Sequence, residues 1–118
     1  MKILLIGYGY WGKKIFAVFK QLNLLQISVY DIATNKESLD QFLNKIEPID
    51  CVFIVTPAET HFALVKKFLL AGKHVFVEKP LCLNGKEATE LVNLAKKKNK
   101  ILFVDYIYFL LMLFFQYI

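Results

Sequence analysis

A chain of 118 residues, of which 57% are hydrophobic and 15% aromatic, is long enough for one domain with a real core, and this composition excludes an intrinsically disordered protein. Fifteen basic and ten acidic residues give a formal net charge of +5, which by itself suits a nucleic-acid partner. The basic residues are mostly lysine, however, and their dense cluster at 96–100 has no interleaved aromatic side chains for stacking on bases. We interpret this cluster as a solvated helix end and expect no nucleic-acid partner.

Short apolar runs alternate along the chain with segments in which apolar residues recur at helical spacing. Most of the runs lack the alternation of half-exposed strands, which is typical of parallel strands covered by helices on both faces. The predicted strands are Ile3–Ile6, Ile27–Tyr30, Cys51–Val55, Val75–Val77 and Ile101–Val104. The helical patterns between them cover Ile15 to Leu22, Leu39 to Ile46, Glu59 to Ala71 and Ala88 to Ala95.

Residues at the predicted helix starts agree with this alternation. Thr34 with Glu37, and Thr56 with Glu59, have the spacing of a capping box, and Asn84 can cap the helix that follows it. Repeated strand, helix, strand units form a parallel sheet with right-handed crossovers. The sequence therefore predicts a three-layer α/β fold, a doubly wound parallel sheet with helices on both faces and the strand order 3-2-1-4-5.

A glycine-rich turn, Gly7 to Gly12, joins the first strand to the first helix. In a dinucleotide-binding Rossmann fold, Gly7 would allow the tight turn, Gly9 would leave room for phosphates, and Gly12 would let helix and strand pack closely. Backbone N–H groups at the helix start then meet the pyrophosphate. Three glycines are also ordinary turn chemistry, so this interpretation depends on its context. The predicted cofactor contacts here are Gly7, Gly9, Tyr10, Trp11 and Gly12.

Asp31 lies at the end of the second predicted strand, about 20 residues beyond the last glycine of the turn. A carboxylate at this place hydrogen-bonds the adenosine ribose hydroxyls and repels a 2′-phosphate. An ordinary turn aspartate is the alternative. We predict that Asp31 binds NAD, and that NADP is less favoured, although Lys36 follows closely enough to approach a 2′-phosphate.

The segment Glu78-Lys79-Pro80 follows the fourth predicted strand and carries a carboxylate, an ammonium and a proline. It lies at the strand edge where open parallel sheets bind ligands. A partly desolvated lysine beside a nicotinamide ring suits proton transfer to or from a hydroxyl during hydride transfer. A surface salt bridge in a proline turn is an alternative that the residue types leave open. Lys79 is the candidate catalytic residue.

Together these residues resemble the glucose-fructose oxidoreductase, inositol dehydrogenase and rhizopine-catabolism group, written Gfo/Idh/MocA. The resemblance is carried by the glycine turn, by Thr56 to His61 and above all by Ala71 to Leu81, and it covers residues 1–104. It implies an NAD(P)-dependent oxidoreductase that acts mostly on sugars or polyols, nucleotide sugars included.

The resemblance also implies roles for single residues. It places Lys79 near the reaction centre and Glu78 near the nicotinamide ribose, and it implies a cis peptide between Lys79 and Pro80. Where the family commonly shows Gly-His after the fifth strand, this chain has Asp105 and Tyr106. The contact that the family makes there with cofactor or substrate therefore lacks its usual residues. The predicted cofactor contacts beyond the glycine turn are Asp31, Thr56, Pro57, His61, Glu78, Lys79 and Pro80.

No metal site is expected, because Cys51 and Cys82 lack the spacing of zinc or redox cysteines and are interpreted as small hydrophobes. The almost wholly apolar segment 105–118 is expected to be a tail after the domain at 1–104 and the start of a truncated continuation, since the family carries a second, substrate-binding domain. The apolar run at 106–115 is shorter than the roughly 20 residues of a membrane span, so no span is expected. A homodimer through this tail stays open, as does a shortened remnant.

The leading hypothesis is the NAD(H)-binding domain of an oxidoreductase, which binds its cofactor but lacks full activity in isolation. A cytoplasmic location is expected, because the chain begins with a strand and not with a signal segment. One alternative is a stand-alone NAD(H)-sensing module, which needs no lysine at the nicotinamide end. The other alternative is an inactive remnant that binds nothing.

Overall fold

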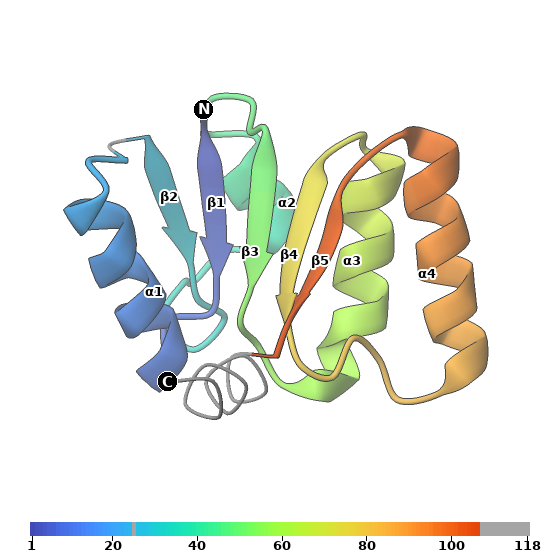
Figure 1. Ribbon diagram of the computed structural model, residues 1–118. Coiled ribbons are helices and arrows are strands. Elements are labelled where there is room, and N and C mark those ends of the chain that lie inside the picture. Colours follow the sequence, from blue (N-terminus) through green and yellow to red (C-terminus); the bar gives the residue numbers. More distant parts are fainter. Residues whose placement is uncertain (25, 107–118) are drawn as a thin grey trace, which may run out of the picture.

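The computed structural model describes residues 1–24 and 26–106, which form a five-stranded parallel sheet with helices on both faces (Figure 1). The α/β prediction is confirmed, and every predicted element is present, most of them with ends shifted by a few residues. The strands are β1 Ile3–Ile6, β2 Ile27–Tyr30, β3 Cys51–Ile54, β4 His74–Glu78 and β5 Leu102–Asp105. The helices are α1 Tyr10–Gln21, α2 Leu39–Leu43, the 3-10 helix η1 Ala58–Thr60, α3 His61–Leu70 and α4 Gly85–Lys98.

The strand order is β2-β1-β3-β4-β5, so the predicted order 3-2-1-4-5 is wrong. β1 pairs with β2 on one side, where Ile3 lies opposite Ile27, and with β3 on the other, where Ile3 lies opposite Cys51. β2 contains Ser28 and is only partly buried along three of its four residues, whereas three of the four residues of β3 are buried. Because burial of apolar surface stabilises the fold, the more apolar strand takes the inner position. The winding direction therefore reverses between β1 and β3.

The two faces of the sheet are covered unequally. On one face Phe19 of α1 packs against Ile3 and Cys51. The larger cluster on the other face joins Val65 of α3 and Leu91 of α4 to the strands, and α2 packs against the same cluster. Figure 1 shows α3 and α4 side by side, next to β4 and β5. Among the described residues, α1 is thus the single helix on its face.

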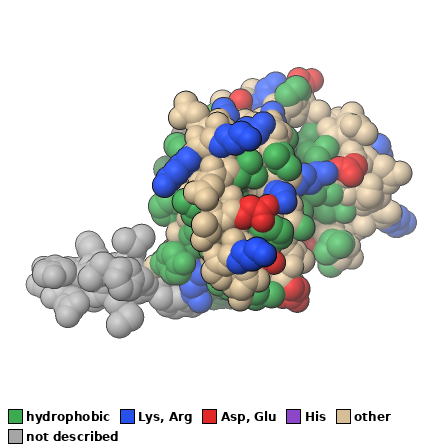
Figure 2. All heavy atoms as spheres, turned by 90° about the vertical axis from the view of Figure 1, so that its right-hand side faces the viewer, with side chains coloured by type: hydrophobic (Ala, Val, Ile, Leu, Met, Phe, Trp, Pro, Cys, Tyr) green, Lys and Arg blue, Asp and Glu red, His purple; other side chains and the backbone are tan. Residues whose placement is uncertain are grey.

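A row of phenylalanine rings extends from α1 across the sheet. Phe19 contacts Phe53 edge-on, Phe53 stacks on Phe76, and Phe76 stacks on Phe103, with centroid distances of 4.8, 4.5 and 5.3 Å. The parallel register places the last three residues opposite one another on β3, β4 and β5. Phe103 is 46% exposed, so the row runs from the core to the surface. On the side of the molecule beyond β5 and α4, hydrophobic side chains lie among charged ones (Figure 2).

The helix starts differ from the prediction at two places. Ser38, and not Thr34, caps α2, because the backbone N–H of Gln41 donates to the Ser38 hydroxyl and the Gln41 side chain accepts from the Ser38 N–H. The residue that directly adjoins the apolar helix positions thus forms the capping box. Thr56 caps no helix, since neither η1 nor α3 has a side-chain cap. Asn84 caps α4 as predicted.

Within the described part of the chain, no helix is both long and apolar enough to cross a membrane. Asp105, which the prediction placed in the tail, is the last residue of β5. Residues 107–118 lie outside the described residues, and with them the predicted dimer contact and the predicted continuation.

Candidate functional site

The turn between β1 and α1 is closely packed at two of its three glycines. Gly7 has a φ of +99°, and a Cβ atom there would lie 2.3 Å from the carbonyl oxygen of Val55. A Cβ atom on Gly12 would lie 2.2 Å from the carbonyl oxygen of Gly7, so α1 and β1 approach as closely as predicted. A Cβ atom on Gly9 would meet nothing within 4 Å. The turn is therefore open to solvent at Gly9 alone among these three positions.

The N-terminus of α1 is suited to an anion. Gly9 is its N-cap residue, no side chain caps the first turn, and the first turn contains no acidic residue. The positive end of the helix dipole therefore has no negative side chain of its own helix beside it. A negatively charged ligand at Gly9 would be stabilised by this end of the helix.

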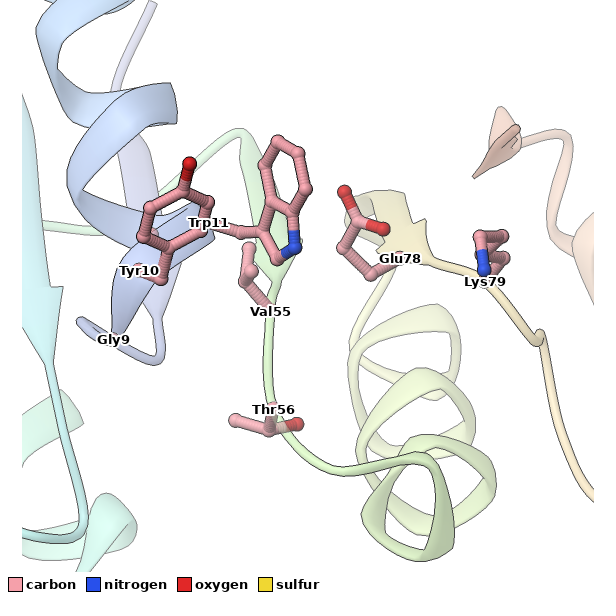
Figure 3. Close-up of a pocket in the computed structure, with 8 residues that line it drawn as sticks. Gly9, Tyr10, Trp11, Val55, Thr56, Glu78 and Lys79 are labelled. Carbon is pink, nitrogen blue, oxygen red and sulfur yellow. The ribbon is translucent and has the colours of Figure 1, made fainter. Parts of the chain in front are cut away.

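A pocket of about 270 Å³ opens beside this helix end (Figure 3). Its wall comes from three segments at the C-terminal ends of parallel strands, which is the edge where such sheets bind ligands. In Figure 3 the Glu78 carboxylate and the Trp11 ring face each other across the pocket. The lining residues are Gly9, Tyr10, Trp11 and Gly12 after β1, Val55 and Thr56 after β3, and Glu78 and Lys79 at the end of β4.

A second pocket, of about 490 Å³, is strongly apolar and adjoins the first at Thr56, which lines both. Sequence reasoning missed this pocket. The signal available in the sequence was Ile32, a hydrophobic residue directly after Asp31. In the structure Ile32 is 79% exposed. The second pocket is lined by Ile6, Tyr30, Ile32, Ser38, Leu39, Thr56, Pro57, Thr60, Ala63 and Leu64.

Asp31 lies at the rim of the apolar pocket and lines neither cavity, although both its neighbours in sequence line the apolar one. Its carboxylate accepts a hydrogen bond from the backbone N–H of Ala33 at 3.2 Å, and its own N–H donates to the Asn35 side chain at 2.8 Å. These bonds close the turn after β2, which is the structural alternative considered for this residue. Lys36 lies exposed on the same turn.

His61 lies beneath the pockets and not on their surface. Its side chain is 1% exposed, with Nδ1 2.6 Å from the carbonyl oxygen of Pro80 and Nε2 2.8 Å from that of Thr56. The imidazole thus bridges the segments that follow β3 and β4. The peptide between Lys79 and Pro80 is cis, as the resemblance implied, and Pro80 lines neither pocket.

Glu78 and Asp105 are the last residues of two adjacent strands and lie opposite each other. Asp105 is only 3% exposed, and its Oδ2 atom is buried with no hydrogen-bond partner among the described residues. Burial raises the pKa of Glu78 to about 7, and the hydrogen bond and negative charge of Asp105 contribute to this rise, while Lys79 acts in the opposite direction. Sequence reasoning missed this pair, although each residue directly follows a predicted strand and the predicted order makes those two strands neighbours.

A parallel sheet whose winding reverses beside a glycine turn, with two adjoining pockets over its strand ends, defines a nucleotide-binding domain of the Rossmann type. The model of the GFO_IDH_MocA family, described as "Oxidoreductase family, NAD-binding Rossmann fold", matches residues 1–106. The chain belongs to this family of NAD-binding oxidoreductases.

Relatives of this chain include proteins with named substrates. The uncharacterized oxidoreductase YdgJ of Escherichia coli is 36% identical over 116 residues, covering 88% of this chain and 34% of that protein. The structure of UDP-N-acetylglucosamine 3-dehydrogenase GnnA from Acidithiobacillus ferrooxidans matches with a TM-score of 0.73 and 30% identity, over 88% of this chain and 36% of that one. The structure of biliverdin reductase from Synechocystis, in complex with biliverdin and NADP+, matches with a TM-score of 0.77 and 27% identity, over 92% of this chain and 39% of that one. The chain therefore spans little more than a third of these relatives.

Proposed function

We propose that this chain is the NAD(H)-binding domain of a dehydrogenase that transfers a hydride between nicotinamide and a hydroxyl or ketone carbon of a sugar, polyol or nucleotide sugar. One observation carries the proposal: a single pocket brings the glycine turn of α1 together with Glu78 and Lys79. Membership of an NAD-binding family supports the cofactor class. The similarity to a UDP-N-acetylglucosamine 3-dehydrogenase supports a sugar nucleotide among the substrate candidates.

The two adjoining pockets fit the two halves of an extended dinucleotide. We propose that the diphosphate binds at Gly9, where the backbone is open and the helix dipole is positive. The apolar pocket beside Ile32 suits the adenine ring, with Asp31 at its rim for the ribose. The pocket with Glu78 suits the nicotinamide half. When bound, the nicotinamide ring accepts or donates the hydride.

Lys79 is the residue that we propose to exchange a proton with the substrate hydroxyl, because it lines the pocket at the nicotinamide end. His61 is a positioning residue that holds the segments carrying Thr56 and Pro80. Since the chain spans little more than a third of its relatives, we propose that residues outside the described domain bind the substrate. The domain alone should then bind cofactor without full turnover.

Asp31 is the basis for proposing NAD in preference to NADP, because its carboxylate would repel a 2′-phosphate. Calorimetric titration with NADH and NADPH tests this on wild type and Asp31→Ala. We expect wild type to bind NADH more tightly than NADPH. In the variant the ratio of the Kd for NADPH to the Kd for NADH should fall about tenfold. Glu90→Ala removes an exposed carboxylate on α4 and should leave the preference unchanged. Absence of binding by both cofactors at about millimolar concentration would contradict the proposed function.

A Lys79→Ala variant separates a dehydrogenase from a cofactor sensor. The variant should keep cofactor affinity in the isolated domain. Joined to the second domain of a relative such as GnnA, it should lose about a hundredfold to ten-thousandfold in turnover, because it lacks the proton-transfer group. Turnover equal to that of the joined wild-type protein would contradict the role proposed for Lys79.

A further inference from the structure

We propose that Glu78 and Asp105 form a carboxyl pair that shares one proton, and that loss of this proton with rising pH makes the pocket favour oxidised over reduced cofactor. The inference rests on the proposed function, because it requires the nicotinamide end of the cofactor to lie beside Glu78. Asp105 lines neither of the two adjoining pockets and acts through Glu78, so it is a positioning residue.

The sheet register places these two residues side by side, and Asp105 is buried. They lie opposite each other at the ends of β4 and β5, and Asp105 is 3% exposed. The hydrogen bond and the negative charge of Asp105 both help to raise the pKa of Glu78. Ionised carboxylates only accept hydrogen bonds, so this bond requires a proton on one of them. The buried Oδ2 atom of Asp105 has no donor among the described residues that would stabilise a second negative charge.

The charged groups around Glu78 determine how loss of the shared proton changes the net charge of the site. Asp105 and Lys79 are the described charged groups that act on Glu78. The Lys14 ammonium of α1 lies 5.8 Å from the centroid of the Trp11 ring, and His61 of α3 directs both ring nitrogens to backbone carbonyls. With one shared proton, the two carboxyl groups and Lys79 are neutral together; without it they carry one negative charge.

This change of charge acts differently on the two redox forms of the cofactor. The diphosphate is the same in both forms, whereas the nicotinamide ring is cationic when oxidised and neutral when reduced. Because the pKa of Glu78 is raised to about 7, the proton leaves within the neutral pH range. Above that range the added negative charge attracts the oxidised ring. One unit charge at this separation in a partly solvated pocket should change the relative affinity about three- to tenfold.

Calorimetric titrations with NAD+ and NADH test the proposal at about pH 6 and about pH 8, one unit on either side of the Glu78 pKa of about 7. In wild type the ratio of the Kd for NADH to the Kd for NAD+ should rise about three- to tenfold between these conditions. Asp105→Asn keeps the shape of the side chain and removes one charge. The Kd ratio of this variant should therefore be the same at both pH values and equal to the ratio that wild type shows at about pH 6. Glu78→Gln should also give a constant ratio. The control Glu47→Gln, which alters an exposed ion pair with Lys2, should keep the wild-type rise.

Carbon NMR of the side-chain carboxyl groups tests the pair without cofactor. The Glu78 carboxyl group should titrate near pH 7 in wild type and at lower pH in Asp105→Asn, which removes the neighbouring negative charge. The same Glu78 titration in wild type and Asp105→Asn, or a wild-type rise of the Kd ratio in the folded Asp105→Asn variant, would overturn the proposal. If that variant fails to fold, a wild-type rise in Glu78→Gln overturns it equally. Failure of both cofactors to bind at either pH contradicts the proposed function, and the NMR titration then decides on the carboxyl pair by itself.

Discussion

The carbonyl oxygen of Gly7 fills the space in which a side chain at Gly12 would begin, 2.2 Å from the position of its Cβ atom. Since the obstacle is backbone, Gly12→Ala should force α1 away from β1. We expect the free energy of unfolding to fall by about 2 kcal/mol or more. Urea denaturation followed by circular dichroism measures this loss, and an unchanged midpoint would contradict the close approach.

Gly9→Ala is the matched substitution in the same turn. The added methyl group meets nothing within 4 Å, and the backbone φ of −79° suits alanine. Stability should therefore fall by at most about 1 kcal/mol, the usual cost of alanine at an N-cap. The methyl group occupies the open side of the turn, so NADH affinity in calorimetry should fall more than stability does. Wild-type affinity in this variant would place the diphosphate elsewhere.

The free energy of unfolding should depend on pH through Glu78. Its pKa is raised from 4.5 to about 7 in the folded protein, so between these values the folded state binds more protons than the unfolded state. The contribution of this group is fully present below about pH 4.5 and is lost as pH rises through about 7. Urea midpoints measured across that range should fall in wild type and fall less steeply in Glu78→Gln. Glu47→Gln should retain the wild-type slope, and equal slopes in all three proteins would contradict the raised pKa of Glu78.

Substitution of His61 should loosen both segments that it joins. His61→Leu leaves the carbonyl oxygens of Thr56 and Pro80 without their imidazole partner in a buried place, which should cost about 2–4 kcal/mol of unfolding free energy. His74→Ala removes the acceptor for the N–H of Ile101 at a more exposed position and should cost about 1 kcal/mol. Denaturant titration of the two variants compares them; equal losses would argue against the bridging role of His61.

Patterns of adjacent residues predicted local structure well and pairing between strands poorly. The strands Ile3–Ile6 and Ile27–Tyr30 have the predicted ends because apolar runs bounded by turns are local signals. The position of β3 depends on which side of β1 buries the most apolar surface, and that is a property of the whole sheet. A partly polar residue such as Ser28 was the sign in the sequence that β2 lies at an edge.

The candidate site shows the same division. Residues of the glycine turn and of Glu78-Lys79 could be predicted because their motifs are contiguous, and the pocket brings them together. Asp105 stands where the family commonly shows Gly-His. Its pairing with Glu78, 27 positions away in sequence, follows from strand register, which no contiguous motif reveals. The resemblance places His61 at the groove surface, but its two ring nitrogens face backbone carbonyls and its side chain is 1% exposed, so it lies beneath.

The chain contains one tryptophan, and that residue is Trp11, on the wall opposite Glu78. Indole emits light at wavelengths that a reduced nicotinamide absorbs and an oxidised one does not. The protein therefore carries an intrinsic optical reporter beside the proposed nicotinamide position. NADH should quench the indole emission by energy transfer and gain emission of its own, and Trp11→Phe should abolish both signals while Tyr8 and Tyr10 remain.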